Sequence, residues 1–171
     1  MKVAITGHTS GLGKALHEFY PGAMVFSRSN GFNIKQPESI ALKAHDCDVF
    51  INNAHDGFCQ VQLLYILYNL WKHHDKTIVC ISSNSADGTK DHPNLYSTEK
   101  RALDHACEQL NNIPGTKCKI VCIKPEYIDT PRVGYVQGVN KIETKELAQF
   151  IFNLINMRGS FWIPKITIHP N

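Results

Sequence analysis

The chain has 171 residues, of which 43% are hydrophobic and 19% charged, and its formal net charge is +3. This length predicts a single globular domain, residues 1–171, whose core needs no disulfide or metal to hold it together. The charge is too small to indicate nucleic acid or a membrane as a partner, although it is compatible with a small anionic ligand. No apolar run reaches the roughly 18 residues of a membrane span and no signal peptide is recognisable, so we expect a cytoplasmic protein.

Apolar, β-branched runs alternate with helical patterns along the chain. Strands are predicted at residues 3–6, 23–27, 32–34, 48–52, 77–82, 119–124 and 161–168, and helices at 12–19, 37–44, 59–74, 96–110 and 144–156. Strands that are apolar on both faces and separated by helices indicate a parallel sheet covered on both sides. The expected fold is therefore α/β: a doubly wound parallel sheet of the Rossmann type, three-layered and reduced in size. The six cysteines form no Cys-x-x-Cys pair, so we expect free buried thiols and no metal site.

A glycine-rich turn joins the first predicted strand to the first helix. It contains Gly7, Gly11 and Gly13 within the run Thr6-Gly7-His8-Thr9-Ser10-Gly11-Leu12-Gly13. Strand, glycine turn and helix amino terminus are the context of a dinucleotide-binding fingerprint, because glycines let the backbone approach a pyrophosphate. Such turns also occur where no ligand binds, so the loop alone does not establish a cofactor site.

The residues after the second strand bear on the choice of cofactor. NAD-binding proteins place a carboxylate there for the ribose hydroxyls, whereas NADP-binding proteins place an arginine nearby. Here the segment reads Ser27-Arg28-Ser29 and contains no acid. This favours NADP over NAD, with a solvated loop arginine as the alternative interpretation.

Three residues predict carbonyl chemistry. Tyr96 and Lys100 are four residues apart and therefore share one face of a predicted helix. Ser83 comes 13 positions before Tyr96 (96 − 83), just after a buried strand and hence at the sheet edge where ligands bind. Hydride transfer to a carbonyl requires a proton donor, and a lysine ammonium makes a phenol a better one. Ser83 would hold the carbonyl oxygen before Tyr96. The alternative interpretation is that these residues have no catalytic role: a packed tyrosine, a solvated lysine and a serine in a turn.

The order of these motifs resembles that of the short-chain dehydrogenase/reductase family, in its compact branch. The similar segments are Thr6 to Gly13, Asn52-Asn53-Ala54, Ser83 with Tyr96 and Lys100, and Pro125 to Thr130. The resemblance implies a homodimer or homotetramer, and it implies cofactor contacts from residues spread over the chain. These are the turn residues Thr9, Ser10 and Leu12, the adenine neighbours Asn33 and Ile34, the ribose neighbours Asn53, Ala54 and Lys100, and the nicotinamide neighbours Pro125, Ile128 and Thr130.

The chain also departs from the family's pattern. His55 stands where the family has a glycine after Asn-Asn-Ala, and Glu126 replaces another glycine. Many members carry a catalytic asparagine in the helix before the serine strand, and the nearest candidates here, Gln60, Gln62 and Asn69, do not align with it. The segment 131–142 is too short for the usual substrate lid.

Two functions remain open from the sequence. The first is an NAD(P)-dependent oxidoreductase acting on a small carbonyl or alcohol substrate, which the serine, tyrosine and lysine favour. The second is an NADP(H)-binding sensor or scaffold with little catalysis, which the shortened lid and the missing asparagine favour. Neither the substrate nor the direction of hydride transfer can be read from the sequence.

Overall fold

The structure is a computed structural model that describes residues 1–171, and its centre is a parallel sheet of six strands. The strands are β1 (Val3–Thr6), β2 (Met24–Phe26), β3 (Val49–Asn52), β4 (Thr77–Ile81), β5 (Lys119–Pro125) and β6 (Lys165–Ile168). The helices are α1 (Gly11–Phe19), α2 (Pro37–Lys43), α3 (Cys59–Trp71), α4 (Leu95–Asn111) and α5 (Thr144–Asn156). None of these helices combines the length and apolar character that crossing a membrane requires.

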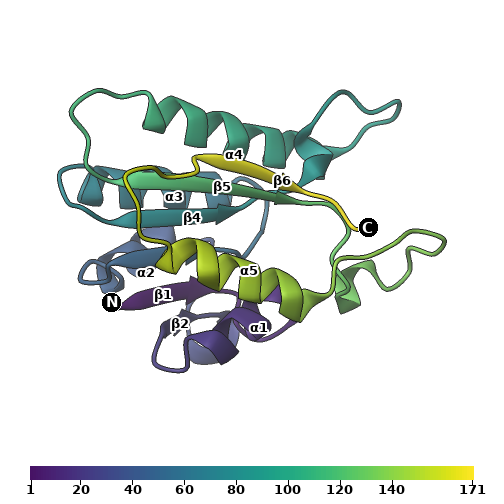
Figure 1. The fold of residues 1–171 in the computed structure, drawn as a ribbon, viewed down its shortest axis with the longest axis horizontal. Coiled ribbons are helices and arrows are strands. Elements are labelled where there is room, and N and C mark those ends of the chain that lie inside the picture. The colour runs from purple at the N-terminus through teal and green to yellow at the C-terminus, as the bar shows by residue number, and fades with distance from the viewer.

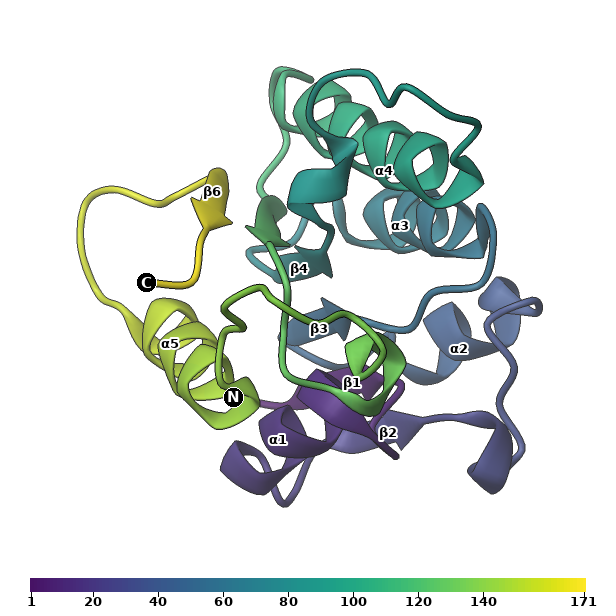
Figure 2. The ribbon, with the colours of Figure 1, turned by 90° about the vertical axis from the view of Figure 1, so that its right-hand side faces the viewer.

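The strands lie in the order β2-β1-β3-β4-β5-β6, and every neighbouring pair is parallel. Helices α2, α3 and α4 pack on one face of the sheet, and α1 and α5 pack on the other (Figures 1 and 2). This arrangement confirms the predicted three-layer, doubly wound α/β fold. The chain leaves β1 toward β2 on one side and returns to place β3 on the other, so the topological switch lies between β1 and β3.

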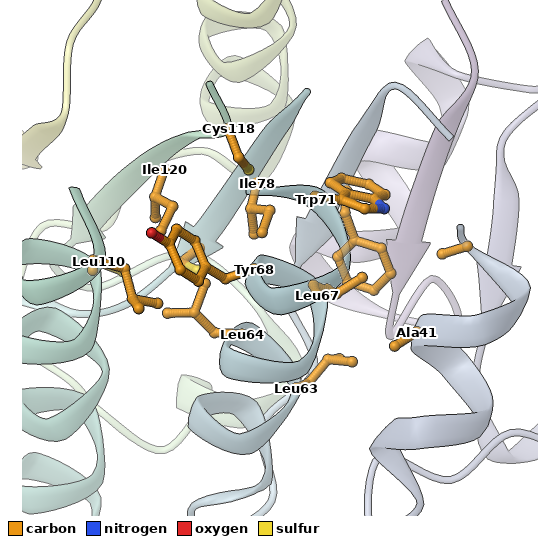
Figure 3. Packing of buried hydrophobic residues seen from close by; sticks show 14 of the residues in the cluster. Ala41, Leu63, Leu64, Leu67, Tyr68, Trp71, Ile78, Leu110, Cys118 and Ile120 are labelled. Carbon is orange, nitrogen blue, oxygen red and sulfur yellow. The ribbon is translucent and has the colours of Figure 1, made fainter. Parts of the chain in front are cut away.

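Alternate residues of each central strand build two separate cores. In β4, Ile78 and Cys80 face α3 and α4, whereas Val79 and Ile81 face α1 and α5. This alternation follows from the two-residue period of a strand, and it explains why the strands read as continuous apolar runs. Figure 3 shows the larger core, in which Tyr68 and Trp71 of α3 point toward the sheet. All six cysteines are free, and five of them are buried, as the sequence predicted.

Two predicted strand segments are wrong. Residues 32–34 form no strand, because Gln36 N–H bonds Asn33 O at 2.9 Å and Lys35 N–H bonds the Asn33 side chain at 3.0 Å. The apolar character of Phe32 instead serves packing, with its ring 4.8 Å from that of Phe26. Residues 161–164 also lie outside the sheet, since pairing with β5 begins at Lys165.

Candidate functional site

A cleft of about 710 Å³ opens at the carboxyl edge of the sheet, at the topological switch between β1 and β3. Ligands of open α/β sheets bind at this edge, next to the switch point. Every residue that the sequence singled out for cofactor binding or catalysis lines this one cleft. They are Gly7, Thr9, Ser10, Gly11, Leu12, Gly13, Ser27, Arg28, Ser29, Asn33, Ile34, Asn53, Ala54, Ser83, Tyr96, Lys100, Pro125, Ile128 and Thr130.

The glycine turn has room for a ligand but not for side chains of its own. Gly7 has φ +75°, a left-handed conformation that favours glycine. A Cβ on Gly13 would lie 2.0 Å from Gly7 O, so α1 can pack this close to β1 only without a side chain there. Ser10 precedes α1 without a side-chain cap, and the first turn of α1 has no acidic residue. The helix amino terminus therefore offers free N–H groups and a positive dipole end toward the cleft.

Thr6 and Asn53 tie the ends of β1 and β3 together beneath this turn. Thr6 Oγ1 accepts hydrogen bonds from Asn53 N at 2.9 Å and from Ala54 N at 3.0 Å. The Asn53 amide returns a bond to Thr6 O at 3.0 Å. These reciprocal bonds fix the spacing of the two strands at the switch point, so the floor of the cleft is rigid.

The end of the cleft next to β2 carries the arginine that the sequence predicted to select NADP. Arg28 begins a single 3₁₀ turn, Arg28–Asn30, whose start is capped by Ser27 and Asn30. The Ser27 and Ser29 hydroxyls lie 2.7 Å apart, and Arg28 makes no ion pair with any acidic residue. This end of the cleft is therefore rich in hydroxyl groups and carries a free positive charge.

Hydrogen bonds hold the Ser83 turn against the start of the Tyr96 helix. Ser97 Oγ, next to Tyr96 in α4, donates to Ser85 O at 2.6 Å, and Ser85 N donates to Ser83 Oγ at 3.1 Å. Asn94 caps α4 by accepting from Ser97 N at 2.9 Å. Ser83 Oγ acts here as an acceptor, so its own hydrogen remains free to donate into the cleft. These bonds hold the Ser83 turn next to the amino end of α4, which carries Tyr96.

Gln60 is a site residue that could not be assigned from the sequence. Its side chain, 1% exposed on α3, accepts a 2.8 Å hydrogen bond from Lys100 Nζ. The Gln60 amide donates to Asn52 O at 2.6 Å and to Ile81 O at 3.0 Å, which fixes its orientation. Lys100 Nζ also donates to Ile81 O at 2.9 Å, and it lies 5.7 Å from the centre of the Tyr96 ring. Of the three amides considered, Gln62 and Asn69 point to solvent instead.

The two buried lysines of the chain differ in their electrostatics. Burial lowers the pKa of Lys100 to about 7, with a smaller contribution from Arg132. Lys124 is also buried, but its contacts with Asp104 and Asp87 outweigh desolvation and raise its pKa. The difference arises because Lys100 has neutral partners and Lys124 has carboxylates. A lysine that is buried without a counter-ion is unusual, and such groups occur most often at functional sites.

Two further residues surround the Tyr96 ring and were not predicted as site residues. The His55 ring packs edge-on at 5.0 Å, and the Arg132 guanidinium lies 5.2 Å from the ring centre. His55 Nε2 lies 2.9 Å from Glu99 Oε2, although off the line of a hydrogen bond. Burial, together with Lys100 and Arg132, lowers the pKa of His55 to about 4, so its imidazole is neutral at pH 7. Arg132 belongs to the short segment after β5, which reaches over the carboxyl edge of the sheet (Figure 2).

The same fold occurs in solved short-chain dehydrogenase/reductases. A short-chain dehydrogenase/reductase from Vibrio parahaemolyticus superposes with a TM-score of 0.78 over 99% of both chains, at 17% identity. A short-chain dehydrogenase from Burkholderia cenocepacia J2315, in complex with NADP, gives 0.77 over 100% of this chain and 90% of its own, at 18% identity. An alcohol dehydrogenase from Thermococcus sibiricus, complexed with 5-hydroxy-NADP, gives 0.76 over 98% and 96%, at 17% identity.

Comparisons of sequence alone found no relative: no family model matches the chain, and no curated protein matches it. At identities of 17–18%, the structural likeness establishes the fold and leaves the activity open. The chain therefore has the short-chain dehydrogenase/reductase fold over nearly its whole length, with the motifs that the sequence predicted gathered at one cleft.

Proposed function

We propose that the chain is an NAD(P)-dependent oxidoreductase that transfers hydride between a nicotinamide cofactor and a small carbonyl or alcohol substrate. One observation carries this proposal: Ser83, Tyr96 and Lys100 line the same cleft as the glycine turn. The alternative interpretation is a packed tyrosine with a solvated lysine. Against it, Lys100 is only 3% exposed, and two hydrogen bonds hold it beside the phenol ring.

The cleft fits a dinucleotide. Its volume of about 710 Å³ lies within the usual range of cofactor and ligand sites. The glycine turn, where a Cβ would collide with backbone at Gly13, leaves a bare surface in front of the α1 amino terminus for a pyrophosphate. Solved proteins of the same fold hold NADP in one case and NADH in another, which supports the same class of cofactor here.

Arg28 makes NADP(H) the preferred cofactor in this proposal. A 2′-phosphate is a dianion, and a free guanidinium flanked by the Ser27 and Ser29 hydroxyls would bind it through charge-assisted hydrogen bonds. The alternative, a ribose held by a carboxylate, lacks its carboxylate in the segment after β2.

Each residue around the carbonyl group of the substrate has a separate role in proton transfer. When bound, the reduced cofactor supplies the hydride that the carbonyl carbon accepts. Ser83 donates a hydrogen bond to the carbonyl oxygen and keeps it before Tyr96, whose phenol gives the oxygen its proton. In its protonated form Lys100 favours the phenolate that remains, and Arg132 adds a permanent positive charge 5.2 Å from the ring centre. Gln60 keeps Lys100 in place and is a positioning residue.

Direct measurements separate this function from that of a cofactor-binding sensor. Quenching of tryptophan fluorescence by NADPH and NADH measures binding, and the loss of NADPH absorbance with a panel of small aldehydes and ketones measures turnover. An oxidoreductase binds NADPH and turns over at least one member of the panel. Tight binding with no turnover of any carbonyl or alcohol would favour the sensor, and the absence of binding would contradict both functions.

A further inference from the structure

Arg132 stands at the Tyr96 end of the cleft without an acidic partner. Its guanidinium carbon lies 5.2 Å from the Tyr96 ring centre, and its Nη2 lies 3.5 Å from His55 Nδ1. No carboxylate lies within ion-pair distance of it. Arg132 lines the cleft together with Tyr96 and Lys100. An arginine so placed carries a permanent charge that nothing in the chain neutralises.

The two acidic residues that line the cleft, Asp56 and Glu126, each face a basic side chain. Asp56 lies 3.5 Å from Lys35 Nζ, and Glu126 lies 2.8 Å from His169 Nδ1. Glu99 is 7% exposed and sits behind the His55 ring, so it does not face the cleft freely. The charge of Arg132 acts on the site, since it contributes to the lowered pKa values of both Lys100 and His55. The space before Tyr96 therefore favours an anion.

Arg132 is an exposed residue, and its guanidinium contacts two rings at the edge of the cleft. It lies against the Tyr96 ring in a cation–π contact, and the His55 ring stands edge-on to the same tyrosine at 5.0 Å. A neutral imidazole can accept from Arg132 without repelling it. The remaining N–H donors of the fork are free, and their planar geometry matches the two oxygens of a carboxylate.

We propose that Arg132 binds a carboxylate of the substrate, so that the substrates are small oxo acids and the corresponding hydroxy acids. This inference rests on the proposed oxidoreductase function. Ser83, Tyr96 and Arg132 line one cleft, and the guanidinium carbon lies 5.2 Å from the centre of the Tyr96 ring. A carbonyl oxygen placed before Tyr96 would therefore suit a carboxylate on the neighbouring carbon or one carbon further. In the reaction the carbonyl carbon gains a hydride and its oxygen gains a proton. One oxo acid, one NADPH and one H⁺ thus give one hydroxy acid and one NADP⁺.

The cofactor's own phosphates are the other anions that Arg132 could meet. The position of Arg132 against Tyr96 and His55 favours the substrate, because the glycine turn and Arg28 already provide phosphate-binding groups elsewhere in the cleft. The experiment therefore measures cofactor affinity and substrate affinity separately for each variant.

Turnover is measured with NADPH and matched pairs of carbonyl compounds. Pyruvate, 2-oxobutyrate and acetoacetate are compared with methyl pyruvate, butanone and methyl acetoacetate, in the wild type and in Arg132→Met and Arg132→Lys. We expect kcat/KM for the preferred acid to exceed that for its neutral partner by about 100-fold, and Arg132→Met to remove that preference. Arg132→Lys keeps the positive charge but loses the two parallel N–H donors of the guanidinium, so it should retain part of the preference for the acid. The control Arg158→Met removes an exposed arginine outside the cleft and should change nothing.

Binding without chemistry provides a second readout. The tertiary alcohol 2-hydroxyisobutyrate cannot be oxidised at its hydroxyl carbon, and calorimetry on the NADP⁺-loaded protein measures its affinity beside that of its amide. If the wild type binds the acid selectively and Arg132→Met does not, the carboxylate site is supported. This holds even if no carbonyl is turned over, and in that case only the oxidoreductase function fails. If the wild type and Arg132→Met both show equal affinity and equal kcat/KM for acids and neutral compounds, the inference is overturned. The proposed oxidoreductase function is then unaffected. A loss of NADPH affinity in Arg132→Met as large as the loss for oxo acids assigns Arg132 to the cofactor, and also overturns it.

Discussion

Lys100 Nζ donates a 2.8 Å hydrogen bond to Gln60 Oε1, and this bond connects the helix that carries Tyr96 to the helix on its flank. Because Gln60 is itself held by Asn52 O and Ile81 O, the lysine is tied to β3 and β4 as well as to α3. The ammonium beside the phenol is thus positioned by three neighbouring elements of the fold, and its partners are all uncharged.

Replacing Gln60 tests this positioning role. In Gln60→Met, Lys100 keeps only Ile81 O, and we expect kcat to fall by about 10- to 100-fold because the ammonium loses its fixed position. The variant should also unfold about 1–3 kcal/mol more easily, since buried carbonyls lose their donors. Gln60→Glu instead places a carboxylate beside Lys100, which raises the lysine pKa and should move the corresponding limb of the pH–rate profile to higher pH.

The matched control for Gln60 lies two residues further along the same helix. Gln62 is exposed, and no side-chain hydrogen bond joins it to the rest of the protein, so Gln62→Met should leave kcat and the pH profile unchanged. If Gln60→Met and Gln62→Met behave alike, Gln60 has only a packing role.

The glycine turn predicts a steric effect at Gly13. In Gly13→Ala the new methyl group would lie 2.0 Å from Gly7 O, so the turn must shift and its N–H groups leave their positions. We expect NADPH affinity to fall by at least about tenfold and stability to fall by about 1–3 kcal/mol. Gly22→Ala is the control, because nothing lies within 4 Å of a Cβ at that position. Unchanged NADPH affinity in Gly13→Ala would show that the cofactor does not bind at this turn.

A change of charge at Arg28 should reverse the preference between cofactors. In Arg28→Asp a carboxylate repels the 2′-phosphate of NADPH and can accept hydrogen bonds from the ribose hydroxyls of NADH. We expect the ratio of NADPH affinity to NADH affinity to fall by about 100-fold, measured by fluorescence titration at fixed ionic strength. Arg158→Asp changes the net charge equally outside the cleft and should preserve the ratio; the same shift in both variants would mean a general charge effect.

The buried lysine makes a prediction about stability and pH. The pKa of Lys100 is lowered to about 7 in the folded chain, whereas an unfolded lysine titrates near 10.5. Between these two pKa values the unfolded chain binds up to one more proton than the folded chain. Stability therefore rises with pH above about 7 and is lost progressively as pH falls back toward 7. Between about pH 6.5 and pH 8 this lysine should add about 1 kcal/mol to the unfolding free energy of the cofactor-free protein.

Urea unfolding of the wild type and Lys100→Met across this pH range measures the lysine's contribution. The variant lacks the titrating amine, so its stability curve should be flatter by about that amount, while the contributions of groups that do not interact with Lys100 cancel in the difference. His55 interacts with Lys100, but its folded pKa of about 4 lies below this pH range. Parallel curves would show that Lys100 titrates normally in the folded protein.

Much of the fold was predictable because the signals are local or periodic. The central strands are apolar without a break from Val49 to Ile51 and from Ile78 to Ile81, which only a sheet covered on both faces requires. The strand predicted at residues 32–34 was wrong because the apolar side chain of Phe32 packs against Phe26 and does not belong to a strand. The Asn33 side chain also accepts a hydrogen bond from Lys35 N–H, which favours a turn over an extended backbone.

The candidate site was predictable where motif spacing carries the chemistry, as for Tyr96 and Lys100. Gln60 could not be assigned, because its role depends on a side chain that reaches across from α3 to α4, and nothing in the spacing reports that contact. Arg132 and His55 were equally hidden: one was read as part of a shortened lid and the other as a replaced glycine. Both lie against the ring of Tyr96, which only the folded chain brings near.

The most direct test of the account is turnover by Tyr96→Phe beside the wild type, with NADPH binding measured on the same samples. The phenol hydroxyl supplies the proton, so the variant should lose carbonyl reduction by about 100-fold or more while its NADPH affinity stays within about threefold of the wild type. A variant that reduces the same carbonyl at the wild-type rate would show that Tyr96 is not the proton donor, and the account of this cleft as a reductase site would be wrong.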